Sequence, residues 1–194
     1  MKLFKRLALA ALLVAAVTST QAALADDTAA AADSIVVLAK HSPAKPTDPV
    51  QVHFERFQVT KATFDPKKVE GGKATIEIDV TSLKTGDPKR DTHLGTADYL
   101  DTAKFPRIIV DIDKVKKKAD RTFAAEATVK FRDVTKTYPV TFDVIETKGD
   151  SIRIKSELAF SRLDFKVGKD PKEEKGGGVD ASVTIQLQLT LKRS

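Results

Sequence analysis

The 194-residue chain carries 33 Lys and Arg against 27 Asp and Glu and contains no cysteine, which excludes disulfides and metal sites built on thiolates. Aromatic residues make up only 6% of the chain and Trp is absent, which argues against nucleic-acid binding by a basic face with stacking aromatic rings.

The first 25 residues have the pattern of a cleaved secretory signal peptide. Cations at positions 2, 5 and 6 precede an apolar run over residues 7–17, and Ala-Leu-Ala at 23–25 fits an A-x-A cleavage site. The apolar run is shorter than the roughly 18 to 20 residues that span a bilayer. We therefore expect export and a soluble mature chain from residue 26. Its 30 Lys and Arg against 27 Asp and Glu give a net charge of +3.

After a leader at 26–33, rich in Ala and Asp and expected to be disordered, apolar and polar residues alternate with period two. This alternation is typical of half-buried β-strands. The clearest run is 179–191, in which every odd position is apolar. The pattern predicts about eight strands, at 34–40, 51–64, 73–81, 107–115, 122–131, 138–146, 151–160 and 179–191.

Three segments interrupt the alternation. Phe54 and Phe57 are three residues apart, which predicts a bulge or a helical turn between them. The proline-rich stretch 42–49 is expected to be an exposed loop, and 168–178 a longer loop rich in glycine and charge.

The segment 91–104 follows a helical pattern instead. Leu94, Ala97 and Leu100 have the spacing of a short helix or two, with Asp91 or Thr96 as N-caps. Such an insertion in an antiparallel sheet is expected to plug or cover something. Periodicity alone does not separate a barrel from a sandwich, but the scarcity of Trp and Tyr argues against apolar side chains facing lipid, so we expect them to face inward.

Several motifs, taken together and in order, resemble those of the YceI-like family of periplasmic polyisoprenoid-binding proteins. The central motif is R-D-T-H-L at 90–94, followed by A-D-Y-L-D-T-A-K-F-P at 97–106. Flanking matches are H-F-E-R-F at 53–57, S-L at 82–83 with T-G at 85–86, D-V-T-K-T-Y-P-V at 133–140 and F-S-R-L-D-F at 160–165.

The resemblance implies an all-β domain over residues 34–194, an extended eight-stranded antiparallel lipocalin-like barrel with a short helical insertion around 91–104. It implies a polyisoprenoid, a quinone-like molecule or a similar long-chain amphiphile in the barrel, with no catalysis and no further cofactor. Dimers are common enough in the family that we also expect a homodimer.

The inward-facing positions supply the predicted ligand-binding residues. Small side chains at Ala125, Ala127 and Ser156 are expected to leave room for a ligand. The predicted set is Phe54, Phe57, Leu94, Leu100, Val110, Ile112, Phe123, Ala125, Ala127, Val129, Phe142, Ile154, Leu158, Phe160, Ile185 and Leu187.

Two other functions remain open at this stage. A metal-assisted hydrolase would use Asp91 and His93 with His41 or His53, although no pair of histidines has ligand-like spacing and we favour a structural role for Asp91 and His93 in pinning the insertion. A ligand-free interaction module would use the loops 42–49 and 168–178.

A basic run, formed by Lys114, Lys116, Lys117, Lys118 and Arg121, falls at an expected hairpin turn. Such a run is most often simply solvated, but in a lipid carrier it would allow transient contact with an anionic membrane surface.

Overall fold

The computed structural model describes residues 32–175 and 177–194. The predicted signal peptide and residues 26–31 of the predicted leader lie outside these residues. Asp33, at the end of that leader, accepts hydrogen bonds from the backbone N–H and the hydroxyl of Thr190, both at 2.9 Å. None of the helices in the described part of the chain is long and apolar enough to cross a membrane.

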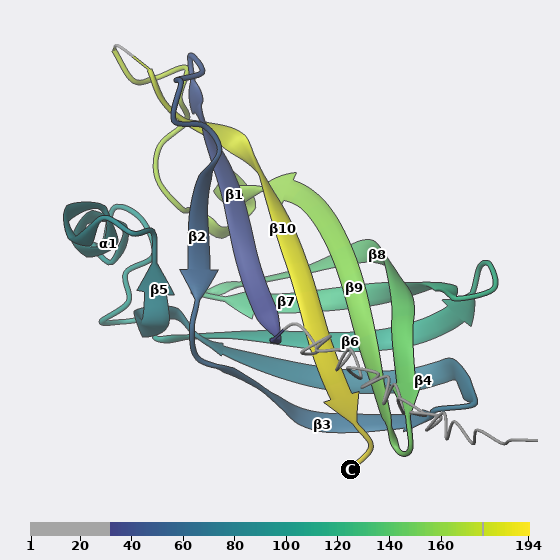
Figure 1. Ribbon diagram of the computed structural model, residues 1–194. Coiled ribbons are helices and arrows are strands. Elements are labelled where there is room, and N and C mark those ends of the chain that lie inside the picture. Colours follow the sequence, from purple (N-terminus) through teal and green to yellow (C-terminus); the bar gives the residue numbers. More distant parts are fainter. Residues whose placement is uncertain (1–31, 176) are drawn as a thin grey trace, which may run out of the picture. The chain divides into compact units, whose positions relative to one another are not determined.

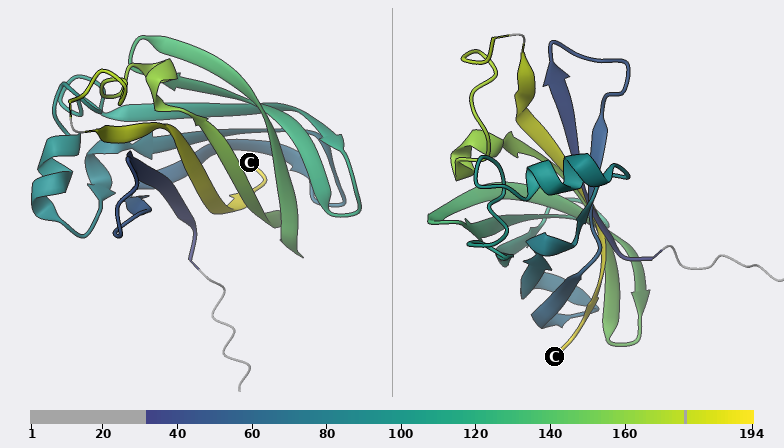
Figure 2. Two further views of the ribbon diagram at one scale, coloured as in Figure 1. Left: turned by 90° about the horizontal axis from the view of Figure 1, so that it is seen from above. Right: turned by 90° about the vertical axis from the view of Figure 1, so that its left-hand side faces the viewer.

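The expected all-β architecture is confirmed, because antiparallel strands form one curled sheet (Figures 1 and 2). The sheet has ten strands, where eight were expected. The strands are β1 (Ser34–Ser42), β2 (Val50–Phe54), β3 (Phe57–Asp65), β4 (Lys68–Asp79), β5 (Leu83–Lys84), β6 (Arg107–Lys117), β7 (Thr122–Phe131), β8 (Val134–Lys148), β9 (Ser151–Ser161) and β10 (Gly178–Lys192).

One additional strand arises because the expected strand 51–64 is broken in two, and the other is β5, which lies beyond the end of the expected strand 73–81. β2 and β3 are separated by a kink at Glu55 and Arg56, where the irregular phenylalanine spacing predicted a bulge or turn. β4 is interrupted by the 3-10 turn η1 (Val80–Ser82) before β5. The Glu55 N–H donates to the Ser82 carbonyl at 3.3 Å, and the Asp79 N–H donates to the Arg56 carbonyl at 2.9 Å, so the two interruptions face each other across the sheet.

The kink brings the two ends of the strand order together. The hydrogen-bonded order is β3-β4-β6-β7-β8-β9-β10-β1-β2-β5, and β2 runs directly into β3. Before the kink this run pairs with β1 and β5, and after it with β4. At the far end of the seam between β3 and β10, the Ser194 N–H donates to the Ala62 carbonyl at 2.9 Å. The sheet therefore curls round on itself and encloses its apolar face.

The core lies on the inner face of this curled sheet. Leu189 on β10 is fully buried, and it is paired in register with Ile154 on β9. Val80 in η1 is also fully buried, so the interruption between β4 and β5 is packed rather than exposed.

The helical insertion begins earlier than the sequence pattern indicated. α1 spans Pro88–Leu94, and its N-cap is Asp87, whose carboxylate accepts hydrogen bonds from the N–H groups of Lys89 at 2.9 Å and Arg90 at 3.3 Å. The prediction of Asp91 or Thr96 as N-cap was wrong, because proline at the first helical position leaves Asp87 free to cap the next N–H groups. Residues 95–105 form hydrogen-bonded turns after the helix.

The proline-rich loop 42–49 is organised by Asp48. Its carboxylate accepts hydrogen bonds from the N–H groups of Lys45 at 2.8 Å and His41 at 3.0 Å, and it lies 2.6 Å from Nδ1 of His41. These bonds, led by that from Lys45, lower the pKa of Asp48 to about 2. The exposed loop is thus held by one carboxylate.

The packing of β10 can be tested by Leu189→Ala. Because Leu189 is fully buried, we expect the free energy of unfolding to fall by about 2 to 5 kcal/mol. Urea denaturation measures the change. Ile145→Ala is the matched control, since Ile145 is 39% exposed and its truncation should cost less than about 0.5 kcal/mol. An equal loss in both variants would contradict this account of the core.

Candidate functional site: an apolar cavity inside the barrel

The interior of the sheet is hollow. Two cavities of about 120 and 180 Å³ lie within it, whereas a single water needs only about 10 to 15 Å³. Their walls are almost wholly aliphatic and aromatic side chains. Space of this kind, bounded by apolar groups, favours an apolar ligand over water.

The two cavities adjoin one another along the barrel. Six residues border both of them, and these form a waist between the two spaces: Ile35, Ile78, Val110, Val129, Leu158 and Ile185. Val110 on β6 and Val129 on β7 are direct partners across the sheet. The waist is therefore built from side chains on several strands, and no single loop closes it.

Inward-facing side chains that would be fully buried in a packed core are only half-buried here. Val110, Ile112 and Val129 belong to this group, as do Ile185 and Leu187 on β10. They alternate with outward-facing polar neighbours, so their partial exposure is toward the interior space. The half-buried inward side chains and the cavities therefore describe the same interior space.

Most of the predicted ligand-binding residues line these cavities. The first cavity contains Val110, Ile112, Ala127, Val129, Phe142, Ile154, Leu158, Ile185 and Leu187 in its wall. The second contains Phe54, Leu94, Leu100 and Phe160, together with Val110, Val129, Leu158 and Ile185. The helical insertion contributes Leu94 and Leu100, so it covers one end of the interior as expected.

Three predicted residues lie elsewhere. Phe57 packs against the core as the register partner of Ile78, and it borders a polar groove instead of either cavity. Ala125 is buried in the packed core without reaching a cavity. Phe123 is buried beside Phe142, its partner across β7 and β8, with ring centroids 5.5 Å apart and planes 17° from parallel, so it flanks the cavity wall.

The sequence reasoning missed further wall residues. Ile76, Ile78, Val140 and Ile152 follow the same period-two pattern and were identifiable from it. Tyr138 on β8 follows this pattern too. Tyr99 and Arg162 carry no such signal, because they reach the second cavity from the insertion and from the 3-10 turn after β9.

Arg162 is a buried cation at this end of the interior. It is 6% exposed, and its guanidinium donates to the carbonyls of Asp180 at 2.9 Å and Lys169 at 2.7 Å, and also to those of Val167 and Val179. Burial lowers the pKa of its guanidinium. The carbonyl acceptors satisfy the cation and tie the turn after β9 to the start of β10.

A second arginine fastens the insertion to the same turn. Arg132, between β7 and β8, donates from Nη1 to the carbonyl of Tyr99 at 3.1 Å and to that of Lys166 at 2.5 Å. The Gly168 N–H also donates to the Asp98 carbonyl at 2.9 Å. We call this end of the barrel, formed by α1, residues 95–106 and residues 162–170, the helix end.

Tyr138 adds a polar group to the wall near the helix end. Its hydroxyl donates to Oδ2 of Asp164 at 2.8 Å, and its ring lies near those of Phe160 and Phe165. Burial, reinforced by this hydrogen bond, raises the pKa of Tyr138 well above its ordinary value. The phenol thus stays neutral at physiological pH.

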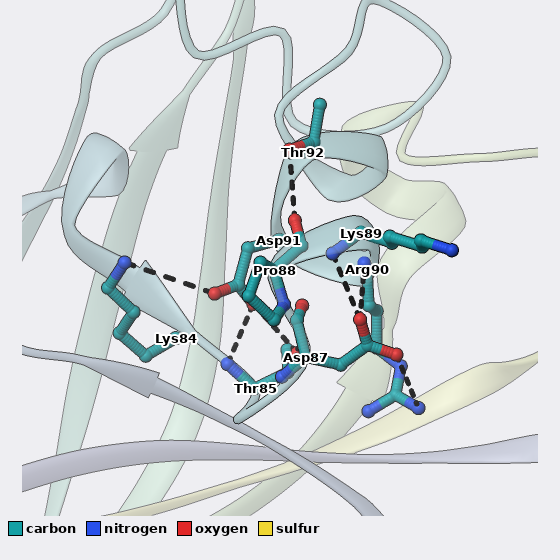
Figure 3. A network of polar contacts seen from close by, with 8 residues as sticks. All are labelled: Lys84, Thr85, Asp87, Pro88, Lys89, Arg90, Asp91 and Thr92. Carbon is teal, nitrogen blue, oxygen red and sulfur yellow. Dashed lines mark hydrogen bonds and ion pairs between the residues drawn. The ribbon is translucent and has the colours of Figure 1, made fainter.

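Asp91 and His93, the centre of the alternative hydrolase hypothesis, have separate structural partners. The carboxylate of Asp91 accepts hydrogen bonds from the N–H of Thr85 at 2.8 Å and from its hydroxyl at 2.7 Å, pinning α1 to the strand end (Figure 3). His93 packs edge-on against Tyr99.

The other two histidines lie apart from this pair. His41 is bonded to Asp48 in the loop 42–49, and His53 on β2 is bonded to Gln51. Within the described residues, no group of three or more His, Cys, Asp or Glu side chains is placed to hold a metal ion.

A curled antiparallel sheet with a hollow apolar interior and a helical cover defines the class of lipocalin-like β-barrels. The YceI-like domain matches residues 28–191, so the chain belongs to the YceI-like family, as the motifs predicted. "Protein YceI" of Escherichia coli O157:H7 is 41% identical over 58 residues, which is 30% of each chain. A UPF0312 protein of Pseudomonas putida strain GB-1 is 28% identical over 125 residues, 64% of this chain and 55% of that one.

Solved structures share the fold. BcnA of Burkholderia cenocepacia superimposes with a TM-score of 0.72 at 20% identity, covering 82% of this chain and 96% of that one. The YCEI protein of Campylobacter jejuni has a TM-score of 0.66 at 18% identity, covering 77% and 88%. A polyisoprenoid binding domain from Saccharophagus degradans has a TM-score of 0.65 at 13% identity, covering 84% and 94%.

The role of Asp91 can be tested by Asp91→Ala. Because the change leaves the Thr85 N–H and hydroxyl without their acceptor, we expect a loss of about 1 to 3 kcal/mol in the free energy of unfolding, measured in urea. Asp98→Ala, an exposed carboxylate in the same insertion, should change it by less than about 0.5 kcal/mol. Unchanged stability of Asp91→Ala would argue against the structural role.

Proposed function

We propose that the protein is a periplasmic carrier that holds a polyisoprenoid or a similar long-chain amphiphile in its two adjoining cavities. The observation that carries this proposal is the apolar, half-exposed interior wall around the waist at Val110 and Val129. Each CH₂ group transferred from water into such a space contributes about 0.8 kcal/mol before ordering costs. A flexible chain that occupies both cavities gains this contribution along its length.

Two further observations support the choice of ligand. The wall offers few polar groups, and Tyr99, Tyr138 and Arg162 all lie toward the helix end. A ligand with a long hydrocarbon part and at most a small polar part matches that distribution. The structural likeness to a protein described as a polyisoprenoid binding domain agrees with this choice.

The same proposal includes location and partners. We infer a periplasmic location from the predicted signal peptide, and the family resemblance supports it; there a protein without cysteine depends on packing for its stability. We also infer a homodimer from the family resemblance and a transient contact with an anionic membrane surface from the basic run between β6 and β7.

The ligand can be identified directly. The protein is purified from a periplasmic extract without detergent, extracted with organic solvent and analysed by mass spectrometry. We expect one long-chain lipid in a near-stoichiometric amount. A protein that is fully folded and carries no lipid above the level of an unrelated periplasmic control protein would contradict the proposal.

The site can be tested by Val129→Phe, which places a ring in the waist between the cavities. We expect at least about a tenfold loss of affinity for a fluorescent polyene fatty acid, with the melting temperature retained because the ring enters empty space. Thr128→Phe is the matched control, since Thr128 points outward from the same strand. Equal affinities in the two variants would show that the interior is not the binding site.

A further inference from the structure

The end of the barrel opposite the insertion is formed by three hairpin turns. These are the turns between β3 and β4, between β6 and β7 and between β8 and β9, and Figure 1 shows them pointing away from α1. We call this the hairpin end. Its chemistry differs from that of the helix end, where two arginines and backbone hydrogen bonds fasten the cover.

Cations gather at the hairpin end from two separate turns. Lys67 lies in the turn between β3 and β4, and Lys68 begins β4. Lys117 ends β6, and Lys118 and Arg121 follow in the turn before β7. Within the described residues none of these five forms an ion pair. Lys114, the first member of the basic run, does form an ion pair, with its Nζ 2.8 Å from Oε2 of Glu126. Their charge is therefore available to an external partner.

These cations surround a hollow that lies against the lipid cavity. The hollow measures about 520 Å³ and is lined by Lys67, Lys68, Lys117 and Arg121 against Glu70 and Asp120. Its apolar side is formed by Val69, Phe123 and Val144.

Only a thin apolar layer separates the hollow from the first cavity. Val69 borders both spaces, while Phe123 on the hollow side is stacked against Phe142 on the cavity side. All three side chains are apolar and contribute only packing contacts to the layer, while Phe123 and Phe142 are also partners across β7 and β8.

An exposed apolar side chain accompanies the cations. Ile145, at 39%, is the exposed large hydrophobic residue of the described chain. It lies at a register shift between Val144 and Glu146 on β8, and the Arg121 guanidinium donates to the neighbouring Val144 carbonyl at 2.6 Å. The bulge turns Ile145 outward beside cations that form no ion pair. This combination favours binding to a partner surface that offers both anionic and apolar groups.

We propose that the hairpin end is the surface with which the protein docks on an anionic lipid bilayer, and that lipid passes through the hollow and between Val69 and Phe123 into the cavity. The membrane is the partner that satisfies both observations, since its headgroups attract the lysines and its interfacial region accepts Ile145. This inference rests on the proposed carrier function, because the route serves the same cavity.

Docking is tested with vesicles of phosphatidylcholine with and without phosphatidylglycerol. The hairpin-end variant carries Lys67→Glu, Lys68→Glu, Lys117→Glu and Lys118→Glu. The matched control carries Lys45→Glu, Lys89→Glu, Lys172→Glu and Lys175→Glu, four exposed lysines outside the hairpin end with the same change in net charge.

At low salt we expect co-sedimentation of the unchanged protein with the anionic vesicles. The hairpin-end variant should bind at least about tenfold more weakly, and the control should keep most of its binding. High salt should release the unchanged protein, because the Debye length shrinks to about 3 Å at 1 M. Equal weakening of both variants would mean that net charge alone matters and would overturn the docking surface, as would undiminished binding of the hairpin-end variant.

Ile145→Ser separates the apolar contribution from the charged one. This exposed change should weaken binding to the anionic vesicles about two- to tenfold without altering the dependence on salt. Binding equal to that of the unchanged protein would remove Ile145 from the docking surface.

The route is tested by the uptake of a fluorescent polyene fatty acid from anionic donor vesicles. The hairpin-end variant should take up the probe more slowly than the control variant, although both bind the same final amount when the probe is added from ethanol. If the two variants took up the probe from vesicles at equal rates and bound the same final amount, the proposed route would be overturned. The carrier function would be unaffected by that result. If the unchanged protein bound no fatty acid even when the probe was added from ethanol, the carrier function would be overturned. The vesicle co-sedimentation would then still test the docking surface on its own.

Discussion

The sheet encloses its apolar face because one chain segment serves two partners, pairing with β1 before the kink at Glu55 and Arg56 and with β4 after it. An open antiparallel sheet with this alternation would expose a continuous apolar surface to water. The hydrogen bonds across the kink, from Glu55 to Ser82 and from Asp79 to Arg56, provide partners for backbone groups where the two ends of the strand order meet. The cavity, its lining and the contrast between the two barrel ends all follow from that closure.

Curling the sheet does not by itself produce a cavity, because the interior of a small β-barrel, of about eight strands, is narrow enough for side chains to fill. Here the inward positions at the waist hold Val110 and Val129, and the neighbouring wall holds Ala127 and Ser156. These side chains are too short to meet across the barrel. Larger groups at the ends, the Phe123–Phe142 pair and the aromatic cluster around Phe165, support the structure on either side of the empty space.

Much of this architecture was predictable, because a strand with one buried face alternates apolar and polar residues along its sequence. The period-two runs located the strands, and the spacing of Phe54 and Phe57 indicated the interruption between β2 and β3. The break at Val80–Ser82 left no signal in the hydrophobic spacing, because it is made by the carboxylate of Asp79, which accepts a hydrogen bond from the Thr81 N–H. Asp87 was identifiable as a cap from the proline that follows it. Arg162 was not, because its acceptors are carbonyls of residues brought close only by the fold.

The pairing of β1 with β10 has a consequence for how the chain folds. Residues 34–42 pair with residues 178–188, so one edge of β1 has no native partner until the last strand is present. A chain made from its N-terminus would carry that edge and much of its apolar face unprotected until β10 is present. Contacts this distant in sequence also slow folding. A chaperone that shields β-strand edges would therefore raise the yield of the folded protein more than it would for a helical protein of equal length.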